Sequence, residues 1–219
     1  MFLYACITAQ ITVSESFEGT TLPTGWASTD AAGTAYTSNS YNTNAGTACA
    51  GTKAINKNLY SFTSSWYLIY SSTASNATAL TYSFKYLAKG YSTTGSVSGN
   101  IAAEYSVDGG TTWTSLLATT TLSSPNATPI PCTTVSGTIP AGTIPTGANF
   151  KFRIKMNYTS PGDYYMGIDD VQLNQVATNP PSCTTISTPA NAATGVAVLP
   201  TITWATASGA SSYDIAIGT

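Results

Sequence analysis

Histidine is absent from this chain of 219 residues, and charged residues of either sign are scarce. Without histidine the chain lacks the commonest general base and the commonest zinc ligand, so it cannot form a Ser-His-Asp or Cys-His catalytic system. Charged residues make up 7% of the sequence, and the net charge is −2. This composition provides no basic surface for a phosphate backbone, and we exclude nucleic acid as a main partner.

Carboxylates are too few and too scattered to indicate an enzyme. The chain has nine acidic residues and a single arginine, Arg153. Glu104 and Asp108 are close in sequence, but they flank one strand and its turn and belong to no wider pattern of the paired carboxylates that glycosidases require. We therefore expect no catalysis by this chain.

Long apolar runs and helical periodicity are also missing, and alternation with a period of two takes their place. No segment other than the start approaches the roughly 20 apolar residues of a membrane helix. The clearest alternation is "ANFKFRIKMNY" at 148–158. There Phe150, Phe152, Ile154 and Met156 alternate with Lys151, Arg153, Lys155 and Asn157. This pattern predicts a strand with one buried face and one wet face.

Similar short segments recur along the chain, separated by Gly, Ser, Thr and Pro. They lie at 12–19, 65–72, 79–88, 100–107, 112–120 and 163–173. Many short strands with such turns predict an all-β fold, a jelly-roll β-sandwich, over residues 11–176. The polar segment 177–182 contains Pro180-Pro181 and predicts an interdomain linker, with a second domain at 183–219.

The start, "MFLYACITAQ", is a short apolar run that ends in small residues. It is typical of the end of a secretory signal peptide, so residues 1–10 predict export, to the medium or the cell surface. The alternative is a first buried strand. Removal of a leader containing Cys6 would leave Cys49, Cys132 and Cys183.

Two motifs at opposite ends of the first domain carry a family resemblance. "SESFEGTTLPTGW" (14–26) and "YYMGIDDVQL" (164–173) resemble the opening and closing motifs of the cleaved-adhesin and choice-of-anchor jelly-roll domains of Bacteroidota surface proteins. MAM domains and several jelly-roll carbohydrate-binding modules share both features. The resemblance spans about residues 13–176 and implies an adhesive or ligand-binding domain.

The same resemblance implies a structural calcium ion between the first and last strands. Its ligands would be Glu18 and either Asp169 or Asp170, because calcium accepts six to eight oxygen ligands in loose geometry. Successive side chains on a strand face opposite ways, so both aspartates can reach one ion only if the strand bulges. The alternative is that these carboxylates cap turns or face solvent.

The last segment, about 182–219, resembles the first half of a fibronectin type III domain. Its predicted strands are "TITW" and "SYDIAIG", with Trp204 filling a small core. A whole domain of this type needs about 90 residues, so we expect the chain to stop within it. Related copies often pair the cysteine that corresponds to Cys183 with one near their far end. This implies a disulfide between Cys49 and Cys132; the alternative is buried thiols.

"SVDGGTTW" at 106–113 resembles the Asp-box of sialidases. Sialidases hold a carboxylate with several arginines and repeat the motif, whereas this chain has one arginine and one copy, so we reject that function. The motif residues Ser106, Asp108, Gly110, Thr112 and Trp113 instead predict a structural hairpin. Asp108 accepts bonds from the turn, glycine supplies positive φ, and Trp113 packs over the turn or into the sandwich.

A ligand site is harder to place. Tyr36, Tyr41, Tyr91 and Tyr158 lie on predicted loops and could stack on sugar rings, but the favoured interpretation is that they are ordinary strand and loop aromatics. The resemblance implies a non-catalytic extracellular adhesion or binding module of a multidomain secreted or cell-surface protein, with a glycan or protein ligand. The alternative is an accessory domain that docks a secreted hydrolase on its substrate, its catalytic domain lying outside these residues.

Overall fold

The fold is described from a computed structural model of the chain. It covers residues 9–36, the backbone of 40–41, and residues 47–125, 128–177, 184, 186–190 and 192–207. Residues 9–177 form one compact unit, and the described residues after 177 belong to a second, smaller unit. Throughout these described ranges the regular structure is β-strand, without a helix.

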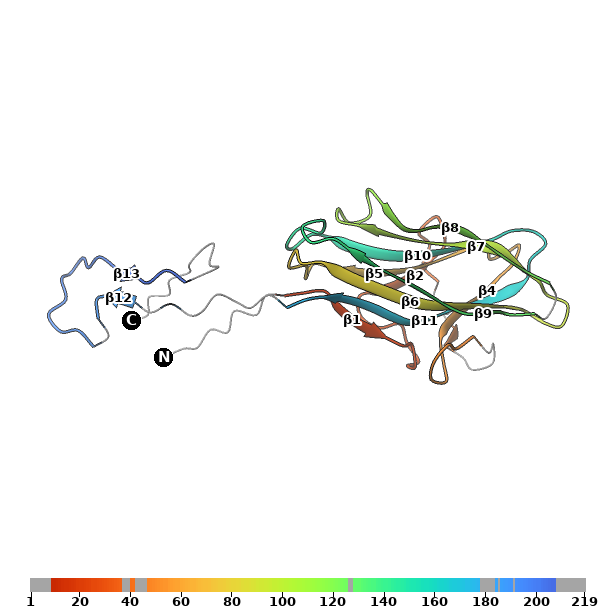
Figure 1. The fold of residues 1–219 in the computed structure, drawn as a ribbon, viewed down its shortest axis with the longest axis horizontal. Helices are drawn as coiled ribbons and strands as arrows, with labels where there is room; N and C mark the ends of the chain where they lie inside the picture. Colours follow the sequence, from red (N-terminus) through yellow and green to blue (C-terminus); the bar gives the residue numbers. More distant parts are fainter. Residues whose placement is uncertain are drawn as a thin grey trace. The chain divides into compact units, whose positions relative to one another are not determined.

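Two antiparallel sheets form the larger unit (Figure 1). The six-stranded sheet has the order β3-β4-β11-β6-β9, and β1 also pairs with β11. Its strands are β1 (Thr12–Glu15), β3 (Ser40–Tyr41), β4 (Ile55–Leu59), β6 (Leu80–Gly90), β9 (Ile130–Ile139) and β11 (Tyr164–Gln175). The five-stranded sheet has the order β2-β5-β10-β7-β8. Its strands are β2 (Trp26–Thr29), β5 (Ser65–Ser72), β7 (Val97–Ser106), β8 (Thr114–Ser124) and β10 (Phe150–Tyr158).

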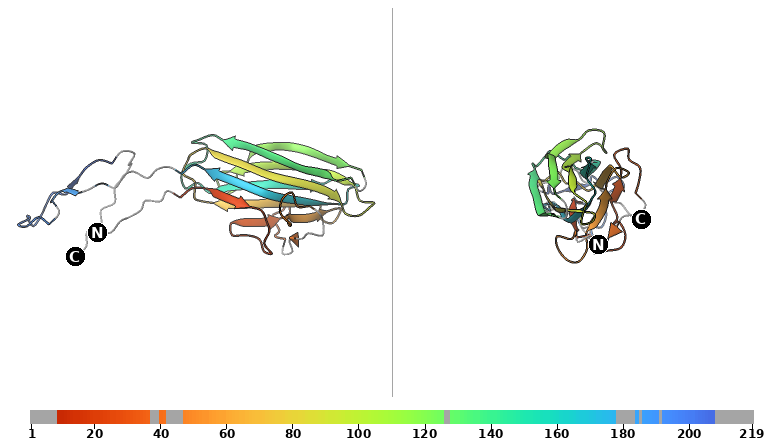
Figure 2. Two further views of the ribbon diagram at one scale, coloured as in Figure 1. Left: turned by 60° about the horizontal axis from the view of Figure 1, so that its bottom comes forward. Right: turned by 90° about the vertical axis from the view of Figure 1, so that its right-hand side faces the viewer.

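The core lies between the two sheets, which form the two layers of a sandwich; Figure 2 shows them from another side. Phe152 of β10 packs against Tyr82 and Phe84 of β6, with ring centroids 6.4 and 6.1 Å apart. Trp66 of β5 is fully buried, and its indole N–H donates a hydrogen bond of 2.9 Å to the Ser28 hydroxyl. The all-β jelly-roll sandwich predicted from the sequence is confirmed.

Alternation on β10 and β6 accounts for their place in the sandwich. The predicted apolar face of β10 is buried from Phe150 to Met156, and its other face is half-exposed. The predicted strand at 65–72 matches β5 in full. In the larger unit, strands β2, β3, β4 and β9 were not predicted. Strand β9, "IPCTTVSGTI", is an edge strand that is mostly exposed, so it has no apolar alternation to reveal it.

The smaller unit contains a two-stranded antiparallel sheet of β12 (Ile186–Thr188) and β13 (Thr203–Trp204). Trp204 is half-buried there, and the predicted strand "TITW" contains β13. The other predicted strand, "SYDIAIG", lies outside the described residues, as do Cys183 and the leader segment 1–8. In the described ranges no helix has the length and apolar character needed to cross a membrane.

Candidate functional site

The opening motif places one side chain in the core and the next on the surface. Phe17 is buried and packs edge-on against Trp26, with ring centroids 5.3 Å apart and an angle of 75° between the rings. Gly25 has a φ of 86°, and a Cβ atom there would lie 3.0 Å from the Tyr70 ring. Glycine is therefore required at this turn, which turns Trp26 into the core.

Glu18, the acid of the opening motif, binds a segment between β3 and β4. We call this segment, residues 47–53, the strap. Glu18 Oε1 accepts hydrogen bonds from the backbone N–H groups of Thr52 (2.7 Å) and Lys53 (3.0 Å), and Oε2 accepts one from the Thr52 hydroxyl (2.7 Å). The bond from the Lys53 backbone, followed by those from Thr52, lowers the pKa of Glu18. Through these hydrogen bonds the Glu18 carboxylate holds one end of the strap.

The first aspartate of the closing motif binds the other end of the strap. Asp169 is fully buried on β11. Its Oδ2 accepts the backbone N–H groups of Cys49 (2.7 Å) and Ala50 (2.9 Å), and its Oδ1 accepts that of Asp170 (2.7 Å). These three donors satisfy a carboxylate that would otherwise be costly to bury.

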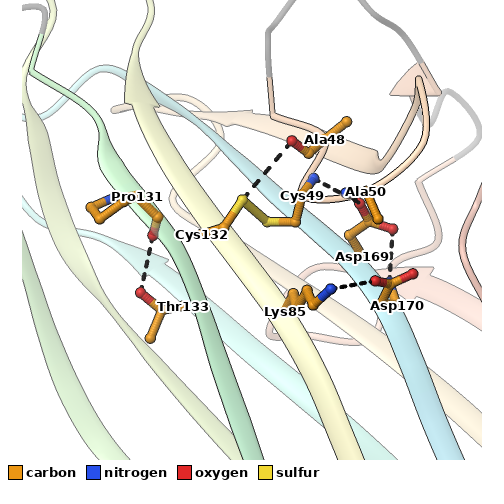
Figure 3. Close-up of a disulfide and its surroundings, with 9 residues drawn as sticks. All are labelled: Ala48, Cys49, Ala50, Lys85, Pro131, Cys132, Thr133, Asp169 and Asp170. Atoms are coloured by element: carbon orange, nitrogen blue, oxygen red, sulfur yellow. Dashed lines mark hydrogen bonds and ion pairs between the residues drawn. A yellow bond between two sulfur atoms is a disulfide. The ribbon is translucent and has the colours of Figure 1, made fainter.

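β11 bulges at the closing motif. Its register with β6 shifts between Asp169 and Gln172, and Asp170 has a φ of 47°. On a regular strand two successive side chains face opposite sides, so it is the bulge that allows Asp169 and Asp170 to reach the same side of β11. Asp170 forms an ion pair with Lys85 of β6 at 2.7 Å, beside the bonds that Asp169 makes to the strap (Figure 3).

A disulfide holds the strap to β9. Cys49 is bonded to Cys132, with Cα atoms 5.5 Å apart, which is the pairing that the family resemblance implies (Figure 3). Thr47, also on the strap, packs against Gly167 of β11, where a Cβ atom would lie 2.5 Å from the Thr47 side chain. The strap therefore lies on the outer face of the six-stranded sheet, held by two carboxylates and one disulfide.

The three predicted calcium ligands contact other groups in this arrangement. Glu18 and Asp169 accept N–H or O–H donors, and Asp170 pairs with an ammonium group. No group of three or more potential metal-ligating His, Cys, Asp or Glu side chains occurs among the described residues. The calcium ion stays a prediction of the resemblance.

The hairpin at 106–113 is built around the Asp108 carboxylate. It accepts backbone N–H groups of Thr111 (3.0 Å) and Thr112 (2.9 Å), and hydroxyl bonds from Ser106 (2.7 Å) and Thr112 (2.6 Å). These bonds, led by those from Thr112, lower the pKa of Asp108 strongly. Gly109 and Gly110 have φ of 74° and 97°. Both oxygens of the Asp108 carboxylate therefore accept hydrogen bonds within the turn.

Trp113 closes this hairpin over the outer face of the five-stranded sheet. Its indole N–H donates to the Gly110 carbonyl (2.9 Å), and the Arg153 guanidinium carbon lies 3.6 Å from the centre of its ring. The Tyr67 ring centre lies 5.6 Å from the same guanidinium. Of the two placements predicted for Trp113, the structure has it over the turn. Tyr67 lies on β5, which pairs with one side of β10, and Trp113 belongs to the hairpin that follows β7, which pairs with the other side.

Glu104 of β7 completes this cluster. It accepts hydrogen bonds from Arg153 Nε (2.9 Å) and Nη2 (2.6 Å), and Lys155 donates to its other oxygen. Partial burial acts to raise the pKa of Glu104, but the bonds from Lys155 and Arg153 outweigh it, and the pKa is lowered. Sequence reasoning placed Arg153 on a wet face but missed the cluster, because its members come from three strands and a turn.

The candidate tyrosines have separate environments. Tyr36 donates to the Ser65 carbonyl (2.8 Å) and lies under Lys57, while Tyr158 packs against the core. Tyr91 is 53% exposed and stacks on Tyr165, with centroids 5.4 Å apart. The side chain of Tyr41 lies outside the described part of the chain. The structure does not gather these four into one platform.

Two solved adhesin domains share the sandwich. The K1 cleaved adhesin domain of Lys-gingipain from Porphyromonas gingivalis W83 is 20% identical, with 77% of this chain and 100% of that one covered and a TM-score of 0.54. The K3 domain of the same protein is 16% identical, with 74% of this chain and 96% of that one covered and a TM-score of 0.50. These likenesses show the fold alone.

A xylan-binding domain is more distant. The CBM22-1 domain of Paenibacillus barcinonensis Xyn10C is 14% identical, with 78% of this chain and 99% of that one covered and a TM-score of 0.45. No protein-family model and no curated protein matches the sequence.

Proposed function

We propose that residues 9–177 are a non-catalytic extracellular adhesion or binding module of a multidomain secreted or cell-surface protein. The observation that carries this proposal is the outer face of the five-stranded sheet. There Tyr67, Trp113, Arg153 and Glu104 form a cluster fixed by mutual contacts. Side chains held in place before a ligand arrives lose less entropy on binding, which suits a recognition surface.

The electrostatics of the carboxylates support a non-catalytic role. A glycosidase needs one carboxylic acid whose pKa is raised so that it can donate a proton. The shifted carboxyl groups, Glu18, Glu104 and Asp108, all have pKa values below the ordinary one. Each is occupied by hydrogen bonds within the fold, so none is suited to act as an acid near neutral pH.

The proposed extracellular location is supported by the sequence and by the names of two proteins with the same fold. The apolar start of the chain and the disulfide are typical of exported proteins. Two of the structures with the same fold are named cleaved adhesin domains and come from Porphyromonas gingivalis. With the sequence motifs, these names support an adhesive module of a Bacteroidota type, secreted or displayed on the cell surface.

A glycan array probed with the full chain tests the proposal. We expect binding to at least one class of plant, animal or microbial glycan, and no new reducing ends after prolonged incubation with the bound glycan. New reducing ends would contradict the non-catalytic role. Silence across the array would remove glycans as ligands and leave a protein partner, to be sought by pull-down with a W113A variant as the matched control.

A further inference from the structure

Positive charge is concentrated on one sheet of the sandwich. The strands of the five-stranded sheet contain three cationic residues, Lys151, Arg153 and Lys155, and one acid, Glu104, a net charge of 3 − 1 = +2. The strands of the six-stranded sheet contain three lysines and three acids, a net charge of 3 − 3 = 0. The hairpin at 106–113, which borders this face, adds Asp108, so the strands and the hairpin together have a net charge of 3 − 2 = +1 in a chain whose net charge is −2.

The three cations form a row, because all of them lie on β10 at alternate positions. Alternate side chains share a face of a strand and are about 7 Å apart. The buried face of β10 begins with Phe150, so Lys151, Arg153 and Lys155 share the outer face. We call these three side chains the cationic row.

Glu104 neutralises only part of this row. It accepts bonds from both Arg153 and Lys155, so one carboxylate faces two cations. Among the described residues Lys151 has neither an ion pair nor a side-chain hydrogen bond. Its ammonium group is therefore available to a ligand.

An open depression lies beside Lys151. It has a volume of about 470 Å³ and opens between the end of β5, the hairpin at 106–113 and the start of β10. Ser71, Ser72, Thr73 and Asn149 line it together with Lys151. Hydroxyl and amide groups around an ammonium offer donors for a carboxylate and partners for neighbouring hydroxyl groups.

We propose that the cationic row and the depression bind a polysaccharide that carries carboxylate groups, that is, a polymer with uronic acid units. This inference rests on the proposed binding function and names its ligand class. Arg153 and Lys155 share the Glu104 carboxylate, so the row leaves a small net positive charge with Lys151 unpaired among the described residues, which suits a ligand with sparse negative charge. Double-stranded nucleic acid has a charge about every 1.7 Å and suits the row poorly. The rings of Tyr67 and Trp113 and the hydroxyl groups of the depression favour a sugar over an acidic peptide.

Affinity electrophoresis and titration calorimetry on the full chain test the ligand class. The probes are polygalacturonate, alginate and hyaluronate, each beside the same polymer after reduction of its carboxylates to alcohols, with polyglutamate as the acidic peptide. We expect binding to at least one carboxylated polymer, loss of that binding on reduction, and weakening as the salt rises from about 0.05 M to about 0.5 M, where exposed charges are screened.

Lys151→Gln tests the site, with Lys89→Gln as the matched control. Lys89 lies on β6, in the other sheet, so both variants remove one lysine charge, but only one removes it from the row. We expect K151Q to weaken binding by roughly fivefold or more, the scale of one charge-assisted hydrogen bond, and K89Q to leave it unchanged. Equal melting midpoints for the two variants would show that folding is intact.

Three outcomes would overturn the inference. Equal binding to the reduced polymers would show a neutral glycan ligand, and the binding function itself would stand. Preference for polyglutamate would show a peptide partner for the row. Absence of binding to every carboxylated polymer would exclude uronic acid polymers as the ligand class. The proposed binding function would be excluded only if the glycan array and the pull-down also detected no ligand.

Discussion

Asp169 illustrates how a single residue can hold a distant segment in place. It is fully buried, and its two oxygens accept three backbone N–H groups, two of which belong to the strap. Its neighbour Asp170 instead makes one ion pair at the surface, with Lys85. The two acids of the closing motif are therefore adjacent in sequence but differ in role, because only Asp169 holds the strap.

Substitution of these two acids should separate their roles. Asp169→Ala leaves the N–H groups of Cys49 and Ala50 without a partner, so we expect the free energy of unfolding to fall by about 1–3 kcal/mol. Asp170→Asn removes a solvent-screened pair and keeps a residue that tolerates the positive φ at this position, and we expect little change. Urea denaturation of the two variants beside the parent chain measures both effects; equal losses would contradict this assignment.

Asp108 should make the stability of the hairpin depend on pH. Its pKa is lowered in the folded chain, so its contribution is complete above the unfolded value of about 4 and is lost as the pH falls below that value. We expect Asp108→Asn to be less stable than the parent at pH 6, and the difference to shrink towards pH 2. Urea midpoints at several pH values measure it. A difference that stays constant with pH would show that the charge is not what holds the turn.

At the scale of elements, the strap depends on a close approach to β11. Gly167 faces Thr47, and a Cβ atom at Gly167 would lie 2.5 Å from the Thr47 side chain and 2.7 Å from its carbonyl oxygen. Only glycine permits this contact, since the second neighbour is backbone and cannot rotate away.

Gly167→Ala should displace the strap. We expect a loss of about 1–3 kcal/mol, as for other overpacked sites, and faster proteolysis between β3 and β4. Gly19→Ala is the control, because the nearest atom to its Cβ is 3.9 Å away. Limited proteolysis with peptide mapping checks both variants. A cleavage pattern identical to that of the parent would count against the close packing of the strap.

At the scale of the whole molecule, the disulfide joins segments 83 residues apart in the sequence. A cross-link over so long a loop restricts the unfolded chain, and removing it costs about 2–5 kcal/mol in small domains. We expect the double variant Cys49→Ala, Cys132→Ala to lose stability on this scale in chemical denaturation. If its stability equals that of the parent, the strap is held by the carboxylates alone.

Calcium dependence is also a property of the whole fold. The family resemblance predicts that calcium raises the melting midpoint and that EGTA lowers it, whereas the hydrogen bonds that Glu18 and Asp169 already accept from the strap predict no change. Differential scanning calorimetry of the full chain measures this. A midpoint raised by calcium and lowered by EGTA would establish the ion and require the strap to rearrange around it.

The local sequence pattern alone was sufficient to predict much of the fold. The alternation on β6 and β10 was sufficient to predict these strands, their buried faces and an all-β sandwich, because the side-chain period of a strand is written directly in the sequence. The chemistry of the hairpin at 106–113 could be predicted for the same reason, since its bonds join residues a few positions apart. Edge strands such as β9 escaped prediction, because an exposed strand needs no apolar face.

Only the tertiary structure decided what the surface residues do. The carboxylates of the two motifs accept N–H groups of the strap, which lies 34 positions from Glu18 and 119 from Asp169 at its nearest bonds. The cluster of Tyr67, Trp113, Arg153 and Glu104 likewise depends on the order of strands in the sheet. Sheet order and loop placement result from packing across the whole domain, so no short stretch of sequence contains them.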